Sequence, residues 1–224
     1  MPEKITYSQE ERLLKIKTTL GETELLLEKF SGTEALSTPF EFKVTMLSTD
    51  FSVDLKQLLR TPATITIFLA DSTERQFNAV FRSLTQAKEG DDIQTERAKM
   101  AISNPSRDLA VYEAILVPQV WFLSLDADCK IFQTMSVPSI VEKVLKDNGV
   151  TDFQFRTNGA YPARDYCVQY RESSLSFIAR LLEEEGIFYF FEHTATKHTM
   201  IFADKSSLLP ACPSQPVAEY SFDQ

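Results

Sequence analysis

Glycine is scarce in this chain, and acidic residues outnumber basic ones. Its six glycines among 224 residues form neither a Gly-x-Gly-x-x-Gly nor a Walker-type loop, which excludes the usual phosphate cradles of nucleotide-binding proteins. The pattern Gly-x-Ser-x-Gly, expected around a hydrolase nucleophile, is absent as well. The 23 Lys and Arg residues against 32 Asp and Glu give a formal net charge of −9. Because phosphate-rich partners need a basic face, this balance argues against nucleic acid and anionic membranes as main partners.

Long apolar runs and paired cysteines are missing too. The longest apolar runs, such as 114–118 and 186–191, are far too short to span a bilayer. Residues 1–12 show no apolar run behind a basic head, so we expect no classical secretory signal peptide. The cysteines are odd in number and widely spaced, which favours reduced, buried thiols in a cytosolic fold over a disulfide framework. They are Cys129, Cys167 and Cys212.

What the chain does contain is a series of short β-type patterns. Residues 40–46 read Phe-Glu-Phe-Lys-Val-Thr-Met, so that every second side chain is apolar. Further short strands are expected at 14–17, 64–69, 77–81, 100–102 and 112–117. Turn signals separate them at 31–32, 37–39, 61–62, 90–92 and 104–106. This punctuation predicts a mainly β fold, an antiparallel barrel or sandwich with a few short helices.

Three short helices interrupt the strands. The first, at 52–59, is a brief amphipathic segment that we expect to plug the end of a barrel. Ser136 can cap the second, and Asn148-Gly149 can end it. Its buried stripe is expected at Val137, Ile140, Val141, Val144 and Leu145. The third begins near Ser173 or Ser174 and ends at Gly186, with an expected buried stripe of Leu175, Ile178, Leu181 and Leu182.

A hairpin is expected after Gly186. Its strands lie at 187–191 and 198–202, and its turn lies at 194–197. The aromatic residues of the first strand do not alternate cleanly, which indicates a strand buried on both faces, inside one fold or at a subunit interface. They are Phe188, Tyr189, Phe190 and Phe191.

Two groups of residues are candidates for chemistry. His193 and His198, with Glu192 and Asp204 nearby, could approach one another across the hairpin and bind a divalent metal. No Cys-x-x-Cys, His-x-His or His-Glu-x-x-His pattern supports such a site, so we favour two exposed hairpin residues. Cys167 could be a thiol nucleophile with a distant histidine, but its mid-strand position favours burial.

The second group is Glu183, Glu184 and Glu185, whose negative charge opposes the dipole at the end of the third helix. They could form a solvated helix end with Arg171 or Arg180 as counter-ion, or a polar contact across a subunit interface. A catalytic carboxylate pair of the glycosidase type is disfavoured, because nothing places it in a cleft. The sequence therefore predicts no catalytic, cofactor-binding or metal site, and no cofactor.

One block of sequence is more specific than any of these features. Residues 166–173, Tyr-Cys-Val-Gln-Tyr-Arg-Glu-Ser, followed by Glu-Glu-Glu-Gly-Ile at 183–187, resemble the signature of the VgrG family. These are trimeric spike proteins of type VI secretion machines and relatives of the baseplate hubs of contractile phage tails. Segments 32–42, 54–59, 112–118 and 129–141 resemble the same family in the same order. Altered turns are expected at Arg60, where a glycine is common, and at Ala79, where Phe-Asn-Gly would be typical; 94–108 is looser than the pattern.

The resemblance implies a phage tail and baseplate hub-like fold. We expect a first β-barrel-like domain at 1–110, a second α+β segment with two helices and a hairpin at 111–205, and a truncated Pro- and Ser-rich connection at 206–224. In a full-length protein it implies a homotrimer that docks on a hexameric Hcp-type tube, contacts baseplate components and carries effectors through C-terminal regions. Such a part has no enzymatic activity; it assembles in the cytoplasm and is exported through the apparatus.

Three alternatives stay open. A baseplate hub of a contractile-tailed phage belongs to the same structural class. A cell-wall or lipid hydrolase effector would need chemistry that no motif supplies. A monomeric carbohydrate-binding β-domain would expose an aromatic platform on a single chain.

Overall fold

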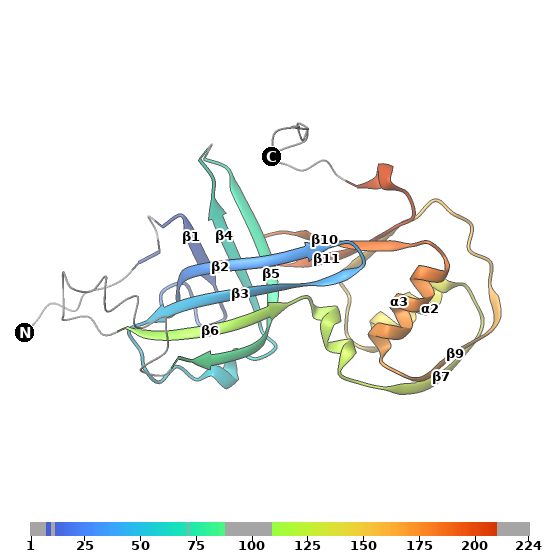
Figure 1. Ribbon diagram of the computed structural model, residues 1–224, viewed down its shortest axis with the longest axis horizontal. Coiled ribbons are helices and arrows are strands. Elements are labelled where there is room, and N and C mark those ends of the chain that lie inside the picture. The colour runs from blue at the N-terminus through green and yellow to red at the C-terminus, as the bar shows by residue number, and fades with distance from the viewer. Residues whose placement is uncertain (1–7, 10–11, 71, 88–108, 210–224) are drawn as a thin grey trace, which may run out of the picture. The chain divides into compact units, whose positions relative to one another are not determined.

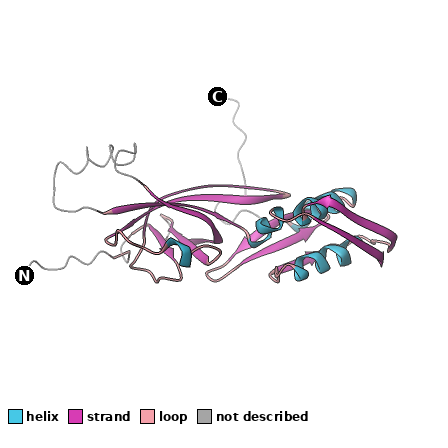
Figure 2. Cartoon of the chain, turned by 90° about the horizontal axis from the view of Figure 1, so that it is seen from below, coloured by secondary structure: helices cyan, strands magenta, loops and turns pink. Residues whose placement is uncertain are grey.

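The computed structural model describes residues 8–9, 12–70, 72–87 and 109–209, and the chain forms two compact units. The first unit takes Met1–Leu123 and Phe191–Thr199, and the second takes Ser124–Phe190 and Met200–Gln224. Strands predominate along the chain, as Figure 2 shows, which confirms the mainly β fold. β6, whose first residue is Ala110, belongs to the first unit's sheet.

A six-stranded antiparallel sheet forms the first unit, in the order β1-β4-β5-β6-β3-β2 (Figure 1). Its strands are β1 (Leu14–Lys17), β2 (Leu26–Ala35), β3 (Thr38–Ser48), β4 (Pro62–Phe68), β5 (Glu74–Gln86) and β6 (Ala110–Val117). Five of the expected strands fall on β1, β3, β4, β5 and β6. The strand expected at 100–102, the turns at 90–92 and 104–106, and Cys212 lie outside the described residues.

The core of this unit follows from the alternation in β3. Phe40, Phe42, Val44 and Met46 all point inward and are almost completely buried. The expected helix at 52–59 is a single 3-10 turn, η1 (Leu55–Gln57), and the Asp54 side chain caps it by accepting the N–H of Lys56. Leu58 follows it into the core and is completely buried.

The expected turn at Ser31-Gly32 is wrong, because both residues lie inside β2. Gly32 stands opposite Phe42 on β3, and a Cβ at Gly32 would collide with the Phe42 ring. The glycine therefore provides room for a core aromatic ring rather than a chain reversal. The reversal comes at Ser37, whose φ of 54° lies in the left-handed region. Arg60 has a φ of 61°, which is the conformation that favours glycine.

A side chain bridges the two end strands of this sheet. The Gln9 amide donates from Nε2 to the carbonyl of Ile16 on β1 at 3.0 Å, and its Oε1 accepts the N–H of the same residue at 2.9 Å. Oε1 also accepts the N–H of Leu27 on β2 at 3.1 Å. The Gln9 side chain thus replaces backbone hydrogen bonds between β1 and β2 and links the two end strands of the curled sheet.

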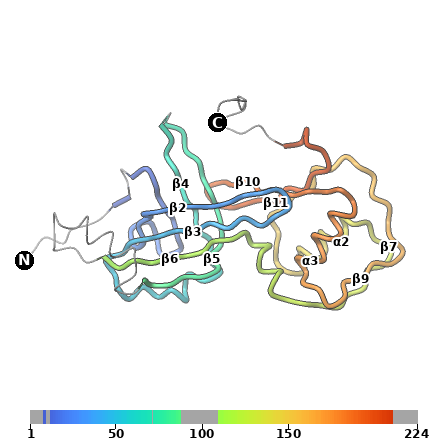
Figure 3. Tube along the Cα trace, viewed as in Figure 1, coloured from blue at the N-terminus to red at the C-terminus, as the bar shows by residue number. Residues whose placement is uncertain are grey.

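The second unit packs two helices with short strands. It contains β7 (Asp128–Met135), α2 (Val137–Asp147), β8 (Phe153–Arg156), β9 (Arg164–Glu172) and α3 (Ser174–Glu184). β7 pairs with β9 in a two-stranded antiparallel sheet. The hairpin strands β10 (Phe188–His193) and β11 (His198–Ala203) contribute residues to both units, and β11 pairs in parallel with β8. The trace in Figure 3 follows the chain through these elements.

Local signals determine both helices. The Ser136 and Ser173 side chains accept the N–H groups of Ser139 and Ser176, as expected for N-caps. Gly149 and Gly186 end the helices with φ values of 75° and 68°. The expected stripe of α2 is confirmed. In α3, Leu175 is only half-buried, and Phe177 takes its place beside Ile178, Leu181 and Leu182.

The aromatic strand β10 has Tyr189 buried, while Phe188, Phe190 and Phe191 are half-buried. Burial on both faces, as its lack of alternation indicated, is therefore partial. No helix among the residues that the structure describes is long and apolar enough to cross a membrane.

Candidate docking surface

The signature block around 166–173 forms a strand-to-helix corner. Gln169 is completely buried on the inner side of β9, and its Nε2 donates to the Glu172 carbonyl at 3.0 Å. Arg171, between them, has a φ of 50°, so the corner holds a left-handed residue. Ser174 then donates from its N–H and Oγ to the Asp126 carboxylate, at 3.3 and 2.8 Å. These contacts give the block a structural role: they direct β9 into α3.

The acidic end of α3 is tied to β9 by arginines. Arg164 donates to Glu184 and to Glu185, each at 2.6 Å, and both hydrogen bonds raise the pKa of its guanidinium. Arg180 bridges Glu172 at 2.7 Å and Glu184 at 3.1 Å, so the expected counter-ion role of Arg180 is confirmed.

Arg171 is not such a counter-ion to these carboxylates, because its guanidinium lies over the Tyr170 ring at 5.4 Å from the centroid. The hydrogen bond from Arg164 is the main reason that the pKa of Glu184 is lowered, with Arg180 adding to the effect. A general acid needs the opposite shift. The lowered pKa of Glu184 therefore does not suit a general acid, and its contacts with Arg164 and Arg180 hold the end of α3.

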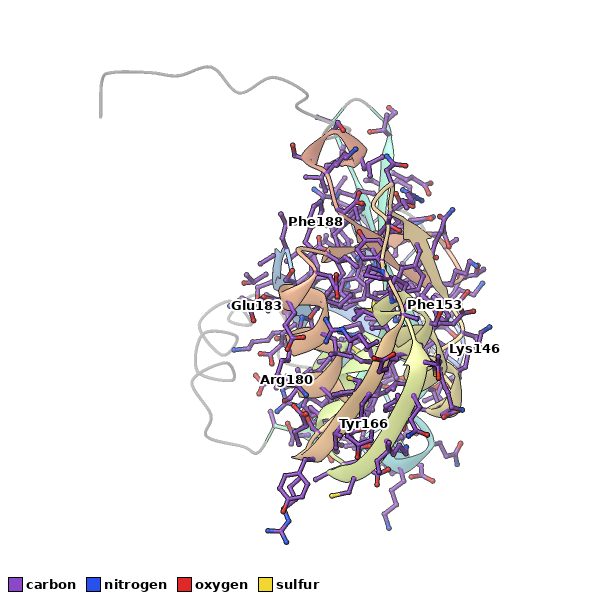
Figure 4. The ribbon with its side chains drawn as sticks, turned by 90° about the vertical axis from the view of Figure 1, so that its right-hand side faces the viewer. Lys146, Phe153, Tyr166, Arg180, Glu183 and Phe188 are labelled. Atoms are coloured by element: carbon purple, nitrogen blue, oxygen red, sulfur yellow. The ribbon has the colours of Figure 1, made fainter. Side chains whose placement is uncertain are left out.

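The outward side of the β7–β9 sheet is largely apolar and is uncovered within the described residues. Cross-strand pairs place Cys129 beside Tyr170, Ile131 beside Val168 and Gln133 beside Tyr166, and we call these six residues the outer β7–β9 face. Ile131, Tyr166 and Tyr170 are 61%, 57% and 66% exposed. Figure 4 looks onto these strands, with Tyr166 labelled. Exposed apolar surface of this kind is typical of an interaction site.

This face also corrects one expectation about the cysteines. Cys129 is exposed rather than buried, because it lies on the outer β7–β9 face. Cys167 lies on the opposite side of the β7–β9 sheet, which faces the helices, and it is buried as expected. Gln169 and Phe132 share that inner side.

The two histidines are buried, so the expectation of exposed hairpin residues is wrong. The side chain of His193 is 8% exposed and His198 is 9% exposed. His193 Nε2 lies 3.0 Å from the Glu34 carboxylate, and its Nδ1 lies 3.2 Å from the Asn78 N–H nitrogen. His198 Nε2 accepts the N–H of Gln119 at 2.9 Å, and its Nδ1 contacts Asn78 Oδ1 at 2.9 Å. Sequence reasoning missed Asn78 because it lies more than a hundred residues away.

The alternative of a metal site finds no support in this geometry. The imidazole centroids are 6.4 Å apart, and all four ring nitrogens face other protein groups. In the parts of the chain that the structure describes, no three His, Cys, Asp or Glu side chains gather as metal ligands.

Asp204 instead fixes a loop of the second unit. Its Oδ2 accepts the N–H groups of Asn158 and Gly159 at 2.8 and 2.6 Å and the Tyr161 hydroxyl at 2.9 Å. Desolvation opposes ionisation of Asp204, but these three hydrogen bonds outweigh it and lower its pKa. Burial, with the hydrogen bond to Asp204, raises the pKa of Tyr161 to about 12.

With this geometry in hand, comparison with known proteins identifies the family. The family model of the phage tail baseplate hub (GPD) matches residues 33–223. This chain belongs to the phage tail baseplate hub family. The hub-like fold expected from the resemblance is therefore confirmed, and the signature corner between β9 and α3 lies within the matched region of this hub.

Relatives of this hub chain include type VI spike proteins. It is 32% identical over 200 residues to the type VI secretion system spike protein VgrG1b of Pseudomonas aeruginosa, covering 89% of this chain and 25% of that protein. With VgrG5 of the same organism it shares 37% identity, over 84% of this chain and 22% of that protein. The actin cross-linking toxin VgrG1 of Vibrio cholerae is 29% identical, with 17% of its length matched. The chain thus spans a quarter or less of these relatives.

Solved structures agree. A component of the type VI secretion system, the E. coli c3393 protein, described as similar to the T4 tail proteins gp27 and gp5, gives a TM-score of 0.69 at 29% identity. The match covers 87% of this chain and 49% of that one. A tail protein of Neisseria meningitidis MC58 gives a TM-score of 0.55 at 12% identity over 85% of this chain and 49% of that one, which shows a shared fold. The resemblance to the VgrG family is confirmed.

Proposed function

We propose that this hub chain is a structural part of a type VI secretion spike, which assembles as a homotrimer and docks on an Hcp-type hexameric tube. The observation that carries the proposal is the outer β7–β9 face, on which the large side chains of Ile131, Tyr166 and Tyr170 are exposed in a chain with a net charge of −9. Assembly would cover this face with a neighbouring copy and gain the free energy of burying three large side chains.

The absence of a chemical role is part of the proposal. Glu184 and Glu185 at the end of α3 are engaged by Arg164 and Arg180, and the imidazoles by Glu34, backbone and amide groups. These arrangements support a mechanical part without catalytic, cofactor or metal site. The acidic balance supports protein partners, the tube and baseplate components, over nucleic acid.

The wider setting follows from the spike assignment. In a full-length protein we propose two hub domains near 1–110 and 111–205, a connection at 206–224, and effectors carried through C-terminal regions. Assembly takes place in the cytoplasm and is followed by export through the apparatus, where the spike helps to puncture the target membrane.

The test is solution mass by light scattering, alone and with a hexameric Hcp-type ring. We expect trimers that bind the ring, and we expect Tyr166→Ser with Tyr170→Ser to shift the mass towards monomer. Leu13→Ser, at an exposed apolar position in the first unit, is the matched control and should leave the mass unchanged. Monomers that ignore the ring, even when joined to the remaining hub and needle of a spike relative, would refute the proposal.

A second candidate is a baseplate hub of a contractile-tailed phage, which the family model favours. The identities of 30% and above with type VI spike proteins favour the first candidate. Binding to a phage tube ring in preference to an Hcp-type ring would reverse that order.

A further inference from the structure

A chain of hydrogen bonds holds the tip of the β10–β11 hairpin in the first unit, and each bond determines which atom is the donor in the next. Thr64 Oγ1 on β4 donates to the Ala195 carbonyl at 2.9 Å, and the same oxygen accepts from Asn78 Nδ2 at 2.9 Å. Because Nδ2 is the donor, Asn78 Oδ1 is left as the acceptor that faces His198 Nδ1 at 2.9 Å. His198 Nδ1 must therefore carry a proton.

The other nitrogen of His198 must not carry one. Nε2 lies 2.9 Å from the backbone nitrogen of Gln119, in η3 (Gln119–Ser124), and accepts its N–H. A proton on Nε2 would place two donors against each other in a buried site, where an unmade hydrogen bond is costly. The geometry thus fixes His198 as a neutral imidazole with its proton on Nδ1.

His193 is placed differently, because its Nδ1 lies beside both a donor and an acceptor of Asn78. Its Nε2–H donates to Glu34, and its Nδ1 lies 3.2 Å from the N–H nitrogen and 3.0 Å from the carbonyl oxygen of Asn78. Neutral Nδ1 accepts the N–H, whereas protonated Nδ1 donates to the carbonyl. An added proton would therefore cost His198 its hydrogen bond with Gln119, whereas Nδ1 of His193 has a partner in either form.

The surroundings support this difference. Phe40 on β3 and Phe191 on β10 pack against the His198 ring, with centroids at 5.7 and 6.3 Å, so a charge there is enclosed by apolar rings. In the described part of the chain, the carboxylate of Glu34 from β2 lies at His193, and Arg75 from β5 lies 3.9 Å from Glu34. Glu192 and Lys197 flank the two histidines in the chain, and the rings themselves lie 6.4 Å apart.

We propose that His198 makes the hairpin tip, residues 191–199, a proton-sensitive clasp within the first unit. Above the ordinary imidazole range, near about pH 6.5, His198 accepts Gln119 and the tip is closed. Below it, the opened tip takes up a proton on Nε2 that the closed tip cannot hold against the Gln119 N–H, so the tip opens while the rest of the sheet stays folded. This inference goes beyond the proposed function and does not depend on it.

Two measurements on the unaltered chain test the clasp. Nitrogen-15 NMR of the imidazoles at pH 7.5 should show the proton of His198 on Nδ1 and that of His193 on Nε2. Amide hydrogen exchange, corrected for intrinsic rates, should show protection of 191–199 that is constant above about pH 7. It should fall by up to about tenfold per pH unit below about 6.5, the slope expected for one proton taken up on opening.

Variants assign the effect to His198. His198→Gln keeps an acceptor for Gln119 but cannot take up a proton, so its protection should be lower at pH 7.5 and independent of pH. His193→Gln is the matched control and should retain the pH dependence. A proton on Nε2 of His198 at pH 7.5, or a protection that is flat from pH 5 to 8 in the unaltered chain, would overturn the proposal even if a variant fails to fold.

Discussion

Replacing Gln9 with methionine tests whether one side chain holds the end strands of the first unit's sheet together. The buried amide makes four hydrogen bonds, to the N–H and carbonyl of Ile16, the N–H of Leu27 and the carbonyl of Glu22. Each is worth about 0.5–1.5 kcal/mol net, and two buried N–H groups would be left without a partner. Because methionine keeps the length of the side chain, the cost is mainly that of these bonds, and we expect a loss of about 3–4 kcal/mol.

The assay is urea unfolding followed by tryptophan fluorescence. Trp121 is the single tryptophan of the chain, and the Arg82 guanidinium lies over its ring at 4.3 Å from the centroid, so its emission reports on the first unit. Gln57→Met is the matched control, because Gln57 is exposed and should change stability by less than about 0.5 kcal/mol. A loss below about 1 kcal/mol for Gln9→Met would show that the sheet is held by other contacts.

Three further predictions concern particular side chains. Gly32→Ala should destabilise the first unit by about 1–3 kcal/mol in the same urea assay, since its methyl group collides with a core ring; an unchanged midpoint would mean that the ring can move aside. Arg164→Gln should lower stability at pH 7 by about 1 kcal/mol or less. Because the pKa of Glu184 is lowered, the stabilisation by Arg164 is present above the ordinary carboxyl range and is lost as the pH falls through the lowered value. The melting curves of the variant and the parent should therefore converge on acidification. A maleimide should modify Cys129 in the folded chain and Cys167 only after unfolding, as mass spectrometry can check; equal rates would contradict the orientation of β7 and β9.

Much of the fold could be predicted because its signals are local. Alternation in β3 gives its core face, and the serine caps and glycine stops give both helices. The turn expected at Gly32 failed because a glycine that gives room to a facing ring has the same sequence signature as a glycine that reverses the chain. Cys129 was expected to be buried but is exposed. Which side of β7 faces the helices depends on its pairing with β9, and the residue type does not reveal it.

The sequence by itself determined the mainly β class, the caps and glycine stops of the two α-helices and the two histidines on one hairpin, because each rests on residues close together in the chain. Motifs in a fixed order along the chain determined the family. Tertiary structure decided what those histidines do. His193 meets Glu34 across 159 residues and His198 meets Asn78 across 120, and no local pattern encodes such pairings. The outer β7–β9 face was decided in the same way, since register alone selects which side chains of a two-stranded sheet the helices cover and which remain exposed.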